Sequence, residues 1–356
     1  MRDVVSDKRI QWIDLVRALA TLLVILCHVV EGVYDMDING MGSLGFWEQI
    51  FVFLMFTVSR MAVPFFLMIT GYLMLDRRYD GKQCEDFVKG KWVPLLVCTE
   101  IWFVIYDFLL YFLDYEEVDL IETIEDVLFF RAVNMTHVWF LPMMLGLYLL
   151  IPFAANAIHD LPPRSMRLPI IIYTFFAFVF PVVQVLETTV GDKNLKLQFA
   201  MGFSGGAYGL YMLFGFMVKK GVFKQFRFSQ LMAMALLNVT LAVLLQMYCF
   251  SKGVNYKVWY DCIFLAVASL LVFEMFSRIK RVHAYRLFRR IAYYSFGVYL
   301  VHNIYRSLLV VNIDRFHTDE SLQGLFLYFA TLALTMLTLV IIDKIPGLGK
   351  FLIYSR

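Results

Sequence analysis

The chain has 356 residues, of which 61% are hydrophobic and only 17% are charged, and its mean hydropathy is +0.70. Long apolar runs recur throughout, and no polar stretch is long enough to form a separate soluble domain. The composition therefore excludes a soluble globular protein, and we expect no nucleic-acid partner. It predicts one all-α domain over residues 1–356, built as a polytopic integral membrane helical bundle. The cysteines have neither metal-ligand spacing nor a disulfide framework, so we expect no bound metal ion.

About ten transmembrane helices are expected from the apolar runs. The expected spans are residues 13–34, 46–75, 92–113, 138–158, 168–187, 203–219, 229–249, 256–276, 291–311 and 323–343. With this count, the connecting segments on one side hold most of the 32 Lys and Arg residues, which places both termini in the cytoplasm. The first span has no convincing cleavage site and is expected to remain as an anchor. We expect a multi-pass protein of the cell membrane, and of a bacterial plasma membrane in particular.

Two segments depart from simple spans. The second apolar run is too long for one untilted crossing and contains Arg60 and Pro64, so a kink is expected there. The external segment 114–137 places apolar residues at helical spacing between 120 and 128, which predicts an interfacial or re-entrant helix.

The first span carries ionisable residues that a membrane helix tolerates only against protein or a water-filled cavity. Arg17 and His28 are eleven positions apart and therefore share one helix face, separated by about 16 Å along the axis. Asp14 and Glu31 lie three residues outside this pair, within reach of the same face. A snorkelling arginine and a satisfied interior histidine would explain each residue alone, but explain the pair less well.

Further polar residues occur deep within other spans. Arg60 lies about halfway through the second segment, and His302 lies near the middle of the ninth, with Tyr299 on its face. Two cytoplasmic segments, 76–91 and 278–290, are strongly basic. The positive-inside rule already explains their sign, whereas a functional interpretation makes them a site for the phosphates of a donor substrate. Candidate phosphate ligands are Lys89, Lys91, Arg278, Arg281, Arg289 and Arg290.

Four segments together resemble the acyltransferase-3 family of polytopic membrane acyltransferases. WIDLVRALATLLVILCH (12–28) contains an arginine, ten residues and a histidine, and SRMAVPFFLMITGYLM (59–74) is similar to an Arg-x-x-Val-Pro-x-Phe-Phe-x-x-Ser-Gly-Tyr segment with Thr70 replacing serine. HVWFLPMMLGLYLLIP (137–152) and YYSFGVYLVHN (293–303) resemble two further family stretches. A basic Arg-x-x-Arg-like cluster before the third span is replaced here by Lys89, Gly90 and Lys91. The extra extracellular hydrolase-like domain of many members is not seen in this chain.

The resemblance implies transfer of an acyl group, often acetyl, from cytoplasmic acyl-CoA to a carbohydrate or glycolipid acceptor. Acyl-CoA is a substrate here, and no permanently bound cofactor is expected. Because acyl transfer needs a base and stabilisation of an oxyanion, we expect His28 to be the general base, with Arg17 and Arg60 binding the donor or stabilising the oxyanion. Residues expected to bind substrate are Asp14, Glu31, Trp139, Tyr299 and His302.

Two questions stay open. A proton-linked transporter or flippase for an anionic or glycolipid substrate would also use intramembrane arginines and histidines, whereas a membrane scaffold would not require them. His28 can act directly on the acceptor hydroxyl or can first form a covalent acyl-histidine, and we favour the direct route. Either route needs a polar, protein-lined passage, with Arg17 in its cytoplasmic half and Arg60 and His302 near its middle.

Overall fold

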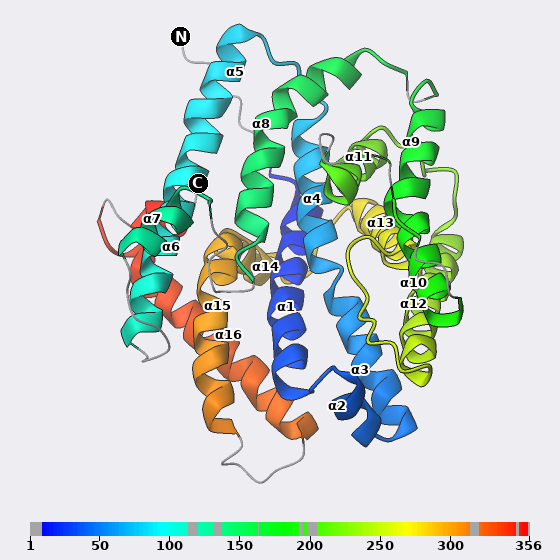
Figure 1. Cartoon of the computed structure of the whole chain (residues 1–356). Helices are drawn as coiled ribbons and strands as arrows, with labels where there is room; N and C mark the ends of the chain where they lie inside the picture. The colour runs from blue at the N-terminus through cyan, green and yellow to red at the C-terminus, as the bar shows by residue number, and fades with distance from the viewer. Residues whose placement is uncertain are drawn as a thin grey trace.

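A computed structural model describes residues 9–112, 120–130, 137–162, 164–191, 195–197, 199, 205–313, 320–346 and 349–354. Every regular element within these ranges is a helix (Figure 1). The predicted all-α fold class is therefore confirmed. The helices are α1 (Gln11–Val33), α2 (Ile38–Ser43), α3 (Phe46–Ser59), α4 (Ala62–Met74), α5 (Gly81–Phe87), the π-helical turn η1 (Val88–Trp92), α6 (Val93–Phe112), α7 (Leu120–Val127), α8 (Phe140–His159), α9 (Arg167–Thr174), the π-helical turn η2 (Phe175–Val179), α10 (Phe180–Val190), α11 (Gly206–Lys219), α12 (Phe228–Ser251), α13 (Ile263–Ser277), α14 (Tyr285–Tyr293), α15 (Ser295–Ile313), α16 (Glu320–Asp343) and α17 (Gly349–Leu352).

Membrane-length helices make up much of the bundle. Seven apolar helical segments in the described ranges are long enough to cross a membrane: 11–33, 46–74, 81–109, 140–159, 167–190, 228–251 and 320–343. Three other expected spans correspond to shorter or more polar helices, namely α11, α13 and α15. The count of ten spans, the cytoplasmic termini and the single domain stay predictions. α7 forms within the expected external helix, whereas residues 114–119 and 131–136 lie outside the described ranges.

The second apolar segment breaks into α3 and α4, close to the expected kink. Pro64 lies two residues after the start of α4. Because proline has no N–H, Pro64 cannot donate to the carbonyl of Arg60 in an α-helical pattern. The helix opens at Arg60 and Met61, and regular bonding resumes where the Phe65 N–H donates to the Met61 carbonyl at 3.0 Å. This break places the Arg60 side chain at a helix junction in the interior, where it is 5% exposed.

One expected span is shorter than its apolar pattern suggested. Residues 256–276 were expected to be helical, but α13 begins only at Ile263, and residues 254–259 before it have no regular secondary structure. The long connection between α12 and α13 turns into the bundle (Figure 1). Side chains replace its missing helical hydrogen bonds, since Gln246 accepts from the Val258 N–H at 3.1 Å and Tyr211 donates to the Tyr260 carbonyl at 2.9 Å. A loop that enters the bundle buries apolar side chains just as a helix does. Hydrophobicity alone therefore predicted a helix where the structure has a loop.

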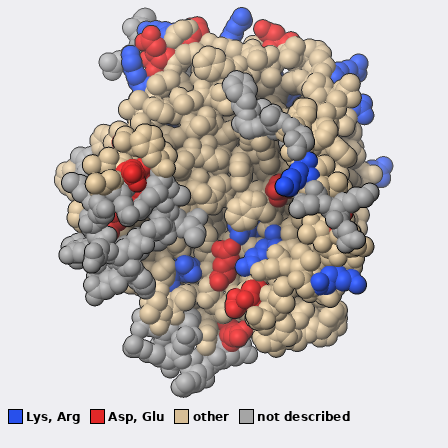
Figure 2. All heavy atoms as spheres, in the orientation of Figure 1, with Lys and Arg blue, Asp and Glu red and all other residues tan. Residues whose placement is uncertain are grey.

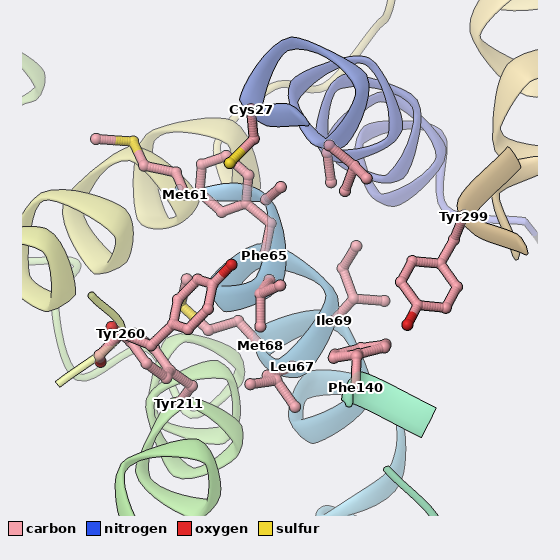
Figure 3. Close-up of a cluster of buried hydrophobic side chains, with 14 of the residues drawn as sticks. Cys27, Met61, Phe65, Leu67, Met68, Ile69, Phe140, Tyr211, Tyr260 and Tyr299 are labelled. Atoms are coloured by element: carbon pink, nitrogen blue, oxygen red, sulfur yellow. Dashed lines mark hydrogen bonds between the residues drawn. The ribbon is translucent and has the colours of Figure 1, made fainter. Parts of the chain in front are cut away.

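Close packing of α4 against α11 forms one wall of the core. A Cβ on Gly71 would overlap the carbonyl oxygen of Met212, and a Cβ on Gly215 would overlap that of Met68. Glycine therefore lets these two helices touch backbone to backbone. Figure 3 shows side chains from α1, α4, α11, α15 and the inserted connection converging on a common interior.

Charged groups are unevenly distributed over the outside of the bundle. In Figure 2 uncharged atoms cover most of the visible face, charged atoms gather along the upper edge, and a mixed acidic and basic group lies over the lower end of α1. At the end of α4, Asp76 forms ion pairs with Lys220 and, at 3.4 Å, with Lys219. Burial alone opposes ionisation of Asp76, but the two lysines outweigh burial, and the pKa of Asp76 is lowered from its ordinary value. This carboxylate therefore stays charged and ties α4 to α11.

Candidate active site

A cavity of about 380 Å³ lies inside the bundle, beside α1. We call it the central cavity. Arg17 and His28 both line it, so it follows the shared face of α1 over about 16 Å of helix axis. Arg60, Trp139 and Tyr299 line it as well. The structure thus brings five of the residues predicted for catalysis or substrate binding, which come from four separate parts of the chain, to one cavity.

His28 is held by a carboxylate one helical turn further along α1. Its Nδ1 lies 2.9 Å from Oε2 of Glu31, and the other carboxylate oxygen accepts from Nη2 of Arg60 at 2.5 Å. A carboxylate only accepts hydrogen bonds, so Nδ1 of His28 is the donor to Glu31, and in the neutral imidazole Nε2 carries the lone pair. The ion pair also gives the buried Arg60 guanidinium a counter-charge, which a cation in this position requires.

Aromatic side chains enclose the remaining faces of Arg60. Its Nη1 donates to the Tyr260 hydroxyl at 3.2 Å, and its Cζ lies 4.5 Å from the ring centroid of Trp259 and 4.6 Å from that of Phe56. Such rings attract the guanidinium through their negative faces. Its Nε is buried and has no hydrogen-bond partner in the described part of the chain.

Two further histidines surround His28. The ring centroid of His302 lies 5.3 Å from that of His28, and the centroid of His137 lies 6.1 Å from it. His137 was not predicted as a site residue. The signal available for it was its place at the start of the 137–152 segment that resembles the family, although no feature of that stretch assigns it a role.

Hydrogen bonds determine which ring nitrogen of each of these two imidazoles is the donor. Nε of Arg306 donates to Oδ1 of Asn303 at 2.6 Å, so Nδ2 of Asn303 donates to Nδ1 of His137 at 3.0 Å. His137 then donates from Nε2 to the Tyr106 hydroxyl at 3.0 Å. His302 donates from Nδ1 to the carbonyls of Val298 and Tyr299. Its buried Nε2 keeps a lone pair without a partner among the described residues.

Asp14, Glu31 and His302 do not line the central cavity, but each lies next to a residue that does. Asp14 is 3% exposed and is occupied by Arg9, whose Nε lies 3.0 Å away, and by the Tyr285 hydroxyl at 2.7 Å. Glu31 is occupied by His28 and Arg60. These two carboxylates therefore hold basic and hydroxyl side chains in place, and the contact with substrate expected of them stays a prediction.

The residues expected at the donor phosphates are dispersed. Lys91 lines the central cavity, whereas Lys89 pairs with Glu85 at 3.2 Å on the surface. Arg278 is bound to Glu274 and to the carbonyls of Phe226 and Phe223. The other three arginines are exposed and do not line the cavity: Arg281, Arg289 and Arg290. Two arginines that were not predicted, Arg9 and Arg77, do line it.

Membrane-length helices around an interior cavity with basic and titratable side chains are the features of a multi-pass membrane protein with an internal polar site. A family model described as an acyltransferase domain matches residues 10–342. The chain belongs to this acyltransferase-3 family, and its family activity is that of a membrane acyltransferase. No curated protein and no solved structure matches the chain.

Proposed function

We propose that the protein transfers an acyl group, in the simplest case acetyl, from cytoplasmic acyl-CoA to a hydroxyl of a carbohydrate or glycolipid acceptor. The observation that carries this proposal is the central cavity, which joins Arg17 near one end of α1 to His28 and Arg60 near the other. A charged thioester and a sugar cannot cross lipid, yet their reacting atoms must approach to about 3–3.5 Å. A passage inside the protein meets both requirements. In this proposal the membrane is a bacterial plasma membrane and both termini are cytoplasmic.

In the proposed reaction His28 acts as a general base through Nε2. It removes the proton of the acceptor hydroxyl while the oxygen attacks the thioester carbonyl. The bond from the carbonyl carbon to sulfur then breaks, and the imidazolium returns its proton to the departing CoA thiolate. The guanidinium of Arg60, a residue that lines the cavity, is the candidate donor to the oxyanion. Arg17, about three turns nearer the cytoplasmic end of α1, is placed to hold the donor.

The test uses purified protein in neutral-lipid nanodiscs with radiolabelled acetyl-CoA and a panel of glycans and lipid-linked glycans. We expect release of CoA with stoichiometric transfer of label to an acceptor hydroxyl. His28→Ala should lower transfer at least 10³-fold, to about the rate without a base, while thermal stability stays close to wild type. A protein that moves labelled glycolipid between leaflets without modifying it, and never releases CoA, would be the transporter instead.

A variant in which His28 is replaced but transfer continues near the wild-type rate would contradict the assigned base. Glu48→Gln is a matched control, because Glu48 caps the N-terminus of α3 outside the cavity. It should leave transfer unchanged.

A further inference from the structure

The connection between α13 and α15 carries unbalanced positive charge. Residues 278–294 contain no Asp or Glu. Arg278 is bound to Glu274 and to two backbone carbonyls. The other basic side chains are exposed and form no ion pair with an acidic residue of the described ranges: Lys280, Arg281, Arg286, Arg289 and Arg290.

The arginines of α14 share one side of the helix. Arg286, Arg289 and Arg290 are three and four positions apart, so they are neighbours on its surface. We call these three residues the basic face. Ala292 is buried against the bundle, whereas Leu287 is 59% exposed and lies three residues before Arg290. An exposed leucine beside a row of arginines is the arrangement of an interfacial helix, in which apolar side chains reach the acyl region and cations meet the headgroups.

Polar contacts at both ends of α14 fix its depth. The Tyr285 hydroxyl donates to Asp14, in the first turn of α1, at 2.7 Å. The Tyr294 hydroxyl, directly after α14, donates to Asp343, the last residue of α16, at 3.0 Å. Both α1 and α16 are long enough to cross a membrane. Because α14 lies where one of these helices begins and the other ends, it lies at the level of one membrane surface.

We propose that the basic face binds the headgroups of anionic phospholipids, such as phosphatidylglycerol, in the adjoining leaflet. Guanidinium groups bind phosphate through paired N–H donors. The positive-inside rule explains the sign of this segment, but it requires neither the shared side of the helix nor the exposed leucine. The phosphates of CoA would offer the same chemistry, yet none of the three arginines lines the central cavity, where the proposed reaction takes place.

The test measures lipid retention by native mass spectrometry of the purified full-length protein. The protein is held in neutral detergent with equal amounts of phosphatidylglycerol and phosphatidylcholine. We expect wild type to retain phosphatidylglycerol in preference. One Lys or Arg near an anionic surface contributes about fivefold in affinity, so Arg289→Gln should weaken phosphatidylglycerol binding about fivefold and leave phosphatidylcholine binding unchanged. The preference should also fall as salt is added.

Two control variants separate this surface from charge in general. Lys252→Gln removes an exposed cation at the end of α12. That helix begins close to Phe226, whose carbonyl binds Arg278, and it is long enough to cross a membrane. Lys252 therefore lies at the opposite surface, and its substitution should not change the preference. Arg289→Lys keeps the charge and should keep most of the preference.

Three results would overturn the proposal: equal retention of both lipids by wild type, no effect of Arg289→Gln, or an equal effect of Lys252→Gln. A CoA titration in phosphatidylcholine nanodiscs distinguishes the two sources of phosphate. If Arg289→Gln weakens CoA binding and leaves phosphatidylglycerol binding intact, the basic face binds the donor and the lipid proposal fails. Wild-type protein that shows the lipid preference but transfers no acyl group would refute the proposed function and leave this inference standing.

Discussion

Substitution of Glu31 by glutamine tests the link between Arg60 and His28. The change keeps the size of the side chain but removes its charge. Glu31 lies 2.9 Å from Nδ1 of His28 and 2.5 Å from Nη2 of Arg60. Glutamine can present its single oxygen to only one of them and its NH2 group to the other. Either His28 loses the acceptor that fixes its tautomer, or Arg60 faces a donor.

The expected magnitude follows from the burial of the pair. Breaking a fully buried ion pair costs about 3–5 kcal/mol. Arg60 is 5% exposed, but the Glu31 side chain is 29% exposed, so water offsets part of the loss and we expect about 2 kcal/mol of destabilisation. Losing the carboxylate that orients a catalytic imidazole lowers kcat by about 10³-fold to 10⁴-fold in enzymes that use such a pair. We therefore expect kcat to fall about 10³-fold with little change in KM for acyl-CoA.

The assay is steady-state CoA release at saturating acceptor, together with thermal unfolding of each variant. Glu31→Asp keeps the charge and should recover part of kcat, which a merely structural role in packing would not predict. Glu85→Gln, which removes an exposed carboxylate paired with Lys89, is the control and should behave as wild type. Near wild-type kcat in Glu31→Gln would refute the reasoning, as would a loss of activity that follows thermal stability alone across the three variants.

The remaining predictions concern packing, the histidine network and the chemical route. Gly71→Ala should destabilise the protein by about 1–3 kcal/mol or prevent folding, measured by thermal unfolding, because its Cβ overlaps the Met212 carbonyl; unchanged stability would contradict the close contact. Asn303→Leu should cost about 1–3 kcal/mol in the same measurement, since Arg306 and His137 lose a buried partner, and a neutral result would contradict the network. Protein quenched after incubation with labelled acyl-CoA and no acceptor should carry no stoichiometric label on His28, as peptide mass spectrometry would establish.

Composition and local periodicity determined the class of fold and part of the site. Apolar runs alone predicted an all-helical membrane-type chain, and four short segments identified the family, because both signals lie within contiguous stretches. The shared face of Arg17 and His28 follows from the geometry of a single helix, so their approach to one cavity needed no knowledge of neighbouring helices. Pro64 marked the break between α3 and α4 for the same local reason.

Contacts between helices were decided only by the tertiary structure. The sequence left the intramembrane carboxylates unpaired, and Glu31 meets Arg60 only because α1 packs against the junction of α3 and α4. Arg9, Arg77 and Lys91 line the cavity, whereas Arg289 is exposed. These positions depend on how the helices pack against one another. Helix propensity and hydrophobic pattern constrain which face is apolar, but not which of several compatible packings brings a given pair of polar side chains together.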